Sequence, residues 1–233
     1  MNSNRKTAII VGVLFLVSYV AVFLGGYIVD SILNAPDYLI NVYPNKTQVI
    51  IGVLIELANG AAVFGIAFML FPILKKHTEA LALGYVGFRI IEAAMAVVSG
   101  ISALSLITLS QEYIAAGAPD ASHFQALGAL TLAERFWALQ MLIIFFGLGA
   151  LIFYYLLYQS KLIPRFISVW GLIGVPLMFT GVLLVMFGFN LELILFLPLG
   201  VNEIFLGVWL IVKGFNSSAI ASLSAKTDIN EIK

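Results

Sequence analysis

The sequence predicts an all-α, polytopic transmembrane bundle of six spanning helices with both termini in the cytoplasm. The 233 residues are 62% hydrophobic and only 10% charged, whereas a soluble domain is close to half apolar and a quarter charged. Six apolar runs are each long enough to cross a hydrocarbon core of about 30 Å. The basic residues gather in the turns on one side of this six-span path.

The alternation of apolar runs and polar turns gives the domain organisation. A polar lead over 1–6 precedes a first run that is too long for a secretory signal and has no small-residue cleavage site after it, so we expect an uncleaved span. Residues 30–48 form a connection that we expect to lie in the interface. Asp120 is a suitable N-cap for a helix that runs unbroken to Tyr158 and projects above the bilayer. The spans are expected at about 7–29, 49–74, 81–109, 133–158, 166–188 and 193–212, within a transmembrane domain of 7–213 that precedes a disordered cytoplasmic tail over 214–233.

In the fifth span, Pro176 near Gly171 and Gly174 predicts a kink or close packing.

The distribution of basic residues predicts the orientation. Among the basic residues in the turns and at the chain ends, only Lys46 lies on one side of the six-span path, and all the others lie on the opposite side. The positive-inside rule therefore places both termini in the cytoplasm, in a multi-pass protein of the cell (inner, cytoplasmic) membrane. The residues on the predicted cytoplasmic side are Arg5, Lys6, Lys75, Lys76, Lys161, Arg165, Lys213, Lys226 and Lys233.

Composition excludes several classes of function. Without cysteine there are no disulfides, thiol nucleophiles, zinc–thiolate sites or iron–sulfur clusters. A net charge of +0 with no basic patch argues against nucleic-acid binding. His77 and His123 lack metal-ligand spacing, and no nucleophile elbow or phosphate-binding glycine loop occurs. We expect no metal and no cofactor; the expected partners are the lipid bilayer and an unidentified small molecule or ion, and the oligomeric state stays open.

Charged residues inside the spans are the candidate functional residues, because an ionisable group in a bilayer needs a partner, a cavity or a neutral state. Counting turns from the cytoplasmic ends puts Arg89 and Glu92 at roughly 13 to 18 Å and Glu203 at about 15 Å, near the midplane. With Asn202, these residues form the predicted buried charge cluster for binding or coupling. Glu56 at about 27 Å and Glu134 at about 36 Å belong to the outer half. The candidates for an outer vestibule are Glu56, Asn59, Glu134 and Arg135.

Helical spacing aligns polar and small residues with these charges. Positions three or four apart share one helix face. Because small residues let helices approach closely, we expect these faces to meet at the bundle centre. Three serines of the third span, Ser99, Ser102 and Ser105, are expected to hydrogen-bond their own helix backbone. The stripe on the third span is Tyr85, Arg89, Glu92, Ala96 and Ser99, and that on the second is Gly52, Glu56, Asn59, Gly60 and Val63.

Three motifs in order along the chain resemble a bacterial family known as domain of unknown function 4386. They are Leu-Gly-Tyr-Val-Gly-Phe-Arg-Ile-Ile-Glu at 83–92, Gln-Ser-Lys-Leu-Ile-Pro-Arg-Phe-Ile-Ser-Val-Trp-Gly-Leu-Ile-Gly at 159–174, and the end of the sixth span from Leu197-Pro198 through Asn202-Glu203 to Asn216. The segment 5–26 fits the start of the family as well. The family often shows Arg-Asp-Trp in the fourth span, where this chain has Arg135-Phe136-Trp137 with its acid one position earlier at Glu134. The resemblance implies a multi-pass bacterial membrane protein and brings no reaction.

Three functions remain open from the residues alone. The first is a small-solute or proton- or cation-coupled carrier or binding protein, since two acids against one guanidinium leave one carboxylate to hold an exchangeable proton or a cation. The second is a structural or regulatory membrane subunit in which the charges only lock the helices. The third is an intramembrane enzyme acting on a lipid, with Glu92 or Glu203 as general acid–base. The sequence favours them in that order, and no catalytic residue is assigned.

Overall fold

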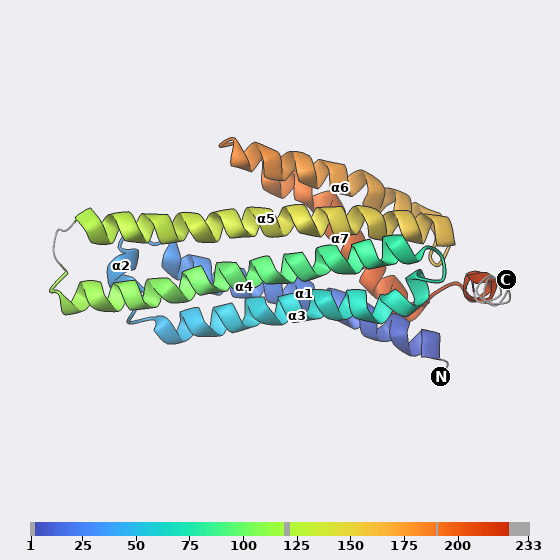
Figure 1. The fold of residues 1–233 in the computed structure, drawn as a ribbon, viewed down its shortest axis with the longest axis horizontal. Helices are drawn as coiled ribbons and strands as arrows, with labels where there is room; N and C mark the ends of the chain where they lie inside the picture. The colour runs from blue at the N-terminus through green and yellow to red at the C-terminus, as the bar shows by residue number, and fades with distance from the viewer. Residues whose placement is uncertain (1–2, 119–121, 190, 224–233) are drawn as a thin grey trace. The chain divides into compact units, whose positions relative to one another are not determined.

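The computed structural model describes residues 3–118, 122–189 and 191–223, and this part of the chain contains helices and no strand. Six of the helices are long and apolar enough to cross a membrane, which confirms the all-α, multi-pass class. α2 is a single short turn between the first two long helices. The helices, labelled in Figure 1, are α1 (Ser3–Leu33), α2 (Tyr38–Asn41), α3 (Lys46–Leu74), α4 (Glu79–Ala115), α5 (Ser122–Ser160), α6 (Arg165–Met186) and α7 (Glu192–Val212).

α5 is much longer than the hydrocarbon core of a bilayer is thick. α5 has 39 residues, which corresponds to about 58 Å against a hydrocarbon core of about 30 Å. It runs unbroken past Tyr158, as the sequence predicts, although the expected N-cap Asp120 lies outside the described residues. The expected disordered tail differs in part: residues 217–223 are helical and bury Ala219 and Leu223, while 224–233 lie outside the described residues.

The chain divides into two compact units, which we describe separately. The first unit comprises Met1–Val17, Ala62–Ile91 and Ile143–Lys233, and the second comprises Ser18–Ala61 and Glu92–Leu142. α1, α3, α4 and α5 each contribute residues to both units, whereas α6 and α7 belong wholly to the first. The described basic residues predicted to be cytoplasmic all belong to the first unit, and Lys46 belongs to the second.

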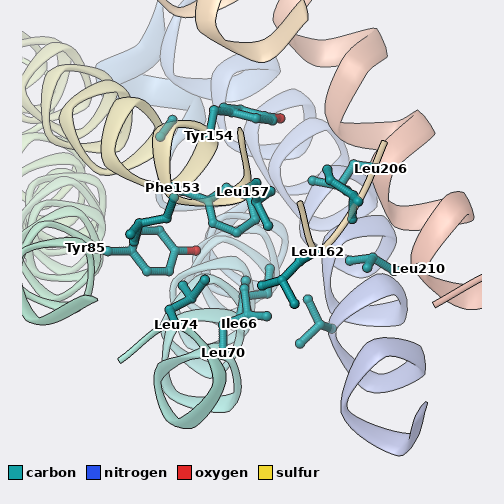
Figure 2. Close-up of a cluster of buried hydrophobic side chains, with 14 of the residues drawn as sticks. Ile66, Leu70, Leu74, Tyr85, Phe153, Tyr154, Leu157, Leu162, Leu206 and Leu210 are labelled. Atoms are coloured by element: carbon teal, nitrogen blue, oxygen red, sulfur yellow. The ribbon is translucent and has the colours of Figure 1, made fainter. Parts of the chain in front are cut away.

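The first unit is built around a continuous apolar core (Figure 2). The rings of Tyr85 and Phe153 stack with centroids 5.2 Å apart, and Phe15 of α1 stacks on Phe153 at 6.1 Å. Because lipid tails are as apolar as leucine, such packing holds the helices together by close van der Waals contact rather than by removal from water. The labelled aliphatic residues of this core are Ile66, Leu70, Leu74, Leu157, Leu162, Leu206 and Leu210.

Glycines on α6 allow its close packing against α5 and α7. An added Cβ at Gly171 would clash with the Tyr154 ring, and one at Gly174 would lie 3.1 Å from the Leu199 backbone. α6 and α7 pack along each other, and Figure 1 shows them side by side. Close packing around Pro176, one of the two outcomes that the sequence predicts there, is therefore present.

The end of α7 is closed by a side chain from the start of α1. The Arg5 guanidinium donates to the carbonyls of Leu210, Ile211 and Val212 at 2.9, 2.6 and 3.3 Å. These are carbonyls of the last helical turn, which have no partner within the helix, and a cation there also opposes the helix dipole. Gly214 follows with φ +76°, a left-handed conformation typical of the residue after a helix.

The second unit has its own apolar core, made by Val29, Val42, Val49, Val53 and Leu106 among others. A buried serine of α4 holds the connection between α1 and α3 against this core. The Ser110 hydroxyl donates to the Leu39 carbonyl at 2.6 Å and accepts from the Tyr43 backbone N–H at 2.9 Å. The connection over 30–48 is thus an ordered segment; that it lies in the membrane interface stays a prediction.

The predicted orientation can be tested directly because the chain has no cysteine. In intact cells, a Lys75→Cys variant is expected to resist a membrane-impermeant maleimide, whereas Lys46→Cys is expected to be labelled. Both lysines are exposed, so the difference reports the side of the membrane rather than burial. Labelling of both in lysed cells is the control, and the opposite pattern in intact cells would reverse the orientation.

Candidate functional site

The second unit contains an ion-pair network around Arg135 of α5, which we call the Arg135 network (Asp30, Glu56, Ser99 and Arg135). The Arg135 guanidinium donates to both oxygens of Glu56, at 3.1 Å from Nη1 and 2.7 Å from Nη2. Nη2 also donates to Asp30 at 3.2 Å, and Nη1 donates to the Ser99 hydroxyl at 2.9 Å. The network joins α1, α3, α4 and α5.

Burial makes this network strong. The Arg135 side chain is 4% exposed and that of Glu56 12%, whereas Asp30 is 47% exposed. A two-pronged contact between guanidinium and carboxylate is the strongest geometry for such a pair. Arg135 and Glu56 were both predicted for an outer vestibule, and the structure brings them together through a direct ion pair.

Two members of the network, Asp30 and Ser99, are not predicted from the sequence as partners of a charge. Asp30 follows the apolar run of α1 and was assigned to the polar connection, but α1 continues to Leu33 and carries it on the helix. Ser99 was expected to bond its own backbone, as Ser102 does to the Val98 carbonyl at 3.2 Å. Ser99 instead accepts from Arg135, and it lies two helical turns after Glu92 on the polar stripe of α4.

The first unit holds a second polar group, which we call the Arg89 cluster (Tyr85, Arg89, Tyr154, Asn202 and Glu203). The Arg89 side chain is 1% exposed, and its Cζ lies 5.4 Å from the Tyr85 ring centroid and 5.0 Å from that of Phe146. Both distances are within the range of cation–π attraction.

Tyr154 of α5 contributes a phenol to the cluster, and its side chain is fully buried. Its hydroxyl has no hydrogen-bond partner among the described residues. On α7, Glu203 is 3% exposed and Asn202 is fully buried. The first unit thus contains a buried guanidinium, a buried carboxylate and a buried phenol on three of its membrane-spanning helices.

Asn202 lies beside Glu203 and faces α6. Its amide Nδ2 donates to the Ile167 carbonyl at 3.0 Å, but its Oδ1 has no partner among the described residues. Ser168, next along α6, is likewise fully buried with an unbonded hydroxyl. Buried polar atoms are nearly always hydrogen-bonded, so each exception needs an explanation.

The remaining predicted site residues are placed as follows. Glu92 is buried at 4% exposure three residues after Arg89 on α4, and it belongs to the second unit. Asn59 is buried and accepts from the Ser18 hydroxyl at 2.5 Å. Glu134 is exposed and takes no part in the Arg135 network. All five residues of the predicted stripe on α4 are buried, from Tyr85 to Ser99.

The chemistry available to these residues is acid–base and ionic. Among the described residues, no three His, Asp or Glu side chains come together as metal ligands. The Arg135 network presents a guanidinium that protein carboxylates already hold in two-pronged geometry. The Arg89 cluster adds a phenol hydroxyl and an amide oxygen that have no hydrogen-bond partner among the described residues, which suits it to polar ligands or to proton transfer.

Comparison with known proteins gives one match. A family model described as Domain of unknown function (DUF4386) matches residues 10–214, which is most of the chain and includes both polar groups. No curated protein and no solved structure matches the chain.

Proposed function

Since the chain belongs to the DUF4386 family of membrane proteins, whose description gives no reaction, we propose its function from the residues: a carrier for a small polar solute, coupled to a proton. The Arg89 cluster is the proposed binding and coupling site. Glu203 exchanges the proton, Arg89 holds the solute or its negative group, and Tyr154 with Asn202 supplies neutral hydrogen bonds.

The observation that carries the proposal is the chemistry of the Arg89 cluster. Ionisable residues within membrane spans are costly and are retained mainly on substrate, ion or proton pathways. Here Arg89 and Glu203 are buried with Tyr154, whose hydroxyl is without a hydrogen bond. A solute with polar groups would use this unfilled hydrogen-bonding capacity, and protonation of Glu203 would change the charge that the solute meets.

The test is solute-driven proton movement in vesicles. The purified protein is reconstituted with a pH-sensitive dye inside, and sugars, amino acids, nucleosides and carboxylates are added one class at a time. The wild type is expected to move protons with at least one class. Glu203→Gln removes the proton-carrying group without changing its shape, so we expect at least a hundredfold loss of that movement.

Glu134→Gln is the matched control, because it makes the same change at an exposed glutamate of α5. It is expected to transport like the wild type. Unchanged proton movement in Glu203→Gln, or no response of the wild type to any of the four classes, would contradict the proposal. Size-exclusion chromatography of each variant separates loss of transport from loss of folding.

A competing function, a structural or regulatory membrane subunit, is favoured by the Arg135 network. There the guanidinium donates to Glu56, Asp30 and Ser99 of the same chain, and such contacts fix the positions of the helices relative to one another. If the Arg89 cluster were a lock as well, Arg89→Met combined with Glu203→Leu would preserve the cellular phenotype, because apolar replacements of buried ion pairs are often tolerated. Under the carrier proposal, this double variant folds but loses the phenotype.

The proposed site of action is the cytoplasmic membrane, with both termini inside. The asymmetry of the basic residues supports this orientation, since all the described basic residues of the first unit lie at helix ends or turns except Arg89.

A further inference from the structure

The first unit has a basic pocket where the turn between α5 and α6 meets the end of α7. The pocket has a volume of about 490 Å³. Three of its lining side chains are cations, Lys161, Arg165 and Lys213, and none of the described residues that line it is acidic. All three are exposed, and the chain as a whole has a net charge of +0. The pocket therefore concentrates positive charge in a neutral protein.

The part of the chain that the structure describes does not pair these cations with acids. Among residues 3–118, 122–189 and 191–223, no carboxylate forms an ion pair with any of the three. Arg165 is held in place instead by the Tyr158 ring, whose centroid lies 4.9 Å from its Cζ. A guanidinium on an aromatic face keeps its N–H groups available for an anion.

The helix ends beside the pocket favour an anion too. The first turn of α6 has no side-chain cap, so no side chain of the protein offsets the partial positive charge of this helix end. The end of α7 would oppose this with its carbonyls, but the Arg5 guanidinium donates to three of them. The Arg5 contacts therefore reduce the negative partial charge that the end of α7 presents to the pocket.

An exposed aromatic surface leads away from the pocket. Trp209 lines the pocket and contacts Phe205 and Phe166 with ring centroids 6.3 and 6.5 Å apart; Phe205 also contacts Trp170 at 6.2 Å. We call these four residues the aromatic ridge. Phe166 is 55% and Phe205 39% exposed, although both belong to membrane-spanning helices. Such residues contact acyl chains, and tryptophan is enriched at the level of the headgroups.

We propose that the basic pocket binds the phosphate of an anionic phospholipid, whose acyl chains lie along the aromatic ridge. The pocket supplies the charge and the two-pronged guanidinium that recognise a phosphate, and the ridge supplies the apolar continuation that a lipid needs and a free phosphate does not. Basic pockets between spanning helices on the cytoplasmic side are known to take anionic headgroups in this way. The proposal is independent of the carrier function, because it uses no residue of the Arg89 cluster.

The test is lipid binding to the delipidated full-length protein in detergent, followed by native mass spectrometry. Phosphatidylglycerol and phosphatidylcholine are the probes. We expect saturable binding of phosphatidylglycerol at least tenfold tighter than that of phosphatidylcholine. Lys161→Gln combined with Lys213→Gln removes two cations and is expected to weaken phosphatidylglycerol binding about thirtyfold.

The matched control is Lys6→Gln combined with Lys75→Gln, which removes the same charge from exposed lysines on the predicted cytoplasmic side but outside the pocket. It is expected to change binding less than twofold. Arg165→Gln is a second variant, expected to weaken binding about fivefold, and it keeps the test decisive if the double lysine variant does not fold.

Each contrary outcome overturns the proposal. Equal weakening by the control pair would mean general attraction to the leaflet rather than a pocket. Equal binding of phosphatidylcholine would mean an unselective lipid surface. Displacement of phosphatidylglycerol by an equimolar concentration of inorganic phosphate would mean a free-phosphate site to which the aromatic ridge contributes nothing.

Discussion

Replacing Glu56 with glutamine is expected to lower the free energy of unfolding by about 3 kcal/mol. The substitution keeps the shape of the side chain but removes the charge that faces Arg135, which is only 4% exposed. Without the charge of Glu56, most of the free-energy cost of removing the guanidinium from water is no longer offset by ion pairing. Unfolding by SDS in mixed micelles measures the loss.

Asp30 and Arg135 provide the controls for this prediction. Asp30→Asn removes the other carboxylate of the network, but that side chain is 47% exposed, so we expect a loss below about 1 kcal/mol. Glu56→Met combined with Arg135→Met is expected to recover most of the stability lost in Glu56→Gln, because no buried charge is left unpaired. A loss equal for Glu56→Gln and Asp30→Asn would show that Glu56 is not the principal partner of Arg135.

The helices themselves could be predicted from the sequence because the bilayer imposes a strict length and composition on each span. A run such as the one at 7–29 has few alternatives to a spanning helix. What the sequence did not define is where each helix stops. α1 continues to Leu33 and α4 to Ala115, past the apolar runs, because helix propagation is limited by backbone breakers and not by polarity. That extension is what places Asp30 on a helix within reach of Arg135.

The candidate charges could be identified from the sequence because charge inside a span is so rare, and their depth follows from the rise per residue. Their partners are a different matter, since they depend on rotation and register between helices. Tyr154 carries no sequence signal that separates it from Tyr155, yet the former is fully buried and the latter is 45% exposed. Glu134 and Arg135 show the same limit: they are neighbours on α5, yet Glu134 is exposed and Arg135 is buried.

The glycines were identified as packing residues in general, but which of them bear helix contacts emerges only in three dimensions. Gly171 is covered by the Tyr154 ring, whereas Gly87 has no neighbour within 4 Å of an added Cβ. Both lie in spanning helices and look alike in the sequence. Close approach depends on which face of each helix meets a neighbour, and small residues allow it without requiring it.

Gly12→Val is expected to destabilise the protein by about 1–3 kcal/mol or more. In the first unit, α1 and α7 approach so closely at this position that an added Cβ on Gly12 would lie 2.5 Å from the Gly207 carbonyl oxygen and 2.7 Å from the Ile211 side chain. The first of these contacts is with backbone, which cannot rotate aside. The helices must therefore separate, and the contacts of Arg5 with the last turn of α7 would be strained as well.

Gly26→Ala is the matched control on the same helix, because no atom lies within 4 Å of an added Cβ there. Removing a flexible glycine from the interior of a helix raises stability by about 0.5–1 kcal/mol where space allows, so the two substitutions are expected to have opposite signs. The measurement is again unfolding in mixed micelles. Tolerance of Gly12→Val, with an unfolding midpoint like that of Gly26→Ala, would mean that α1 and α7 do not meet at this glycine in the folded protein.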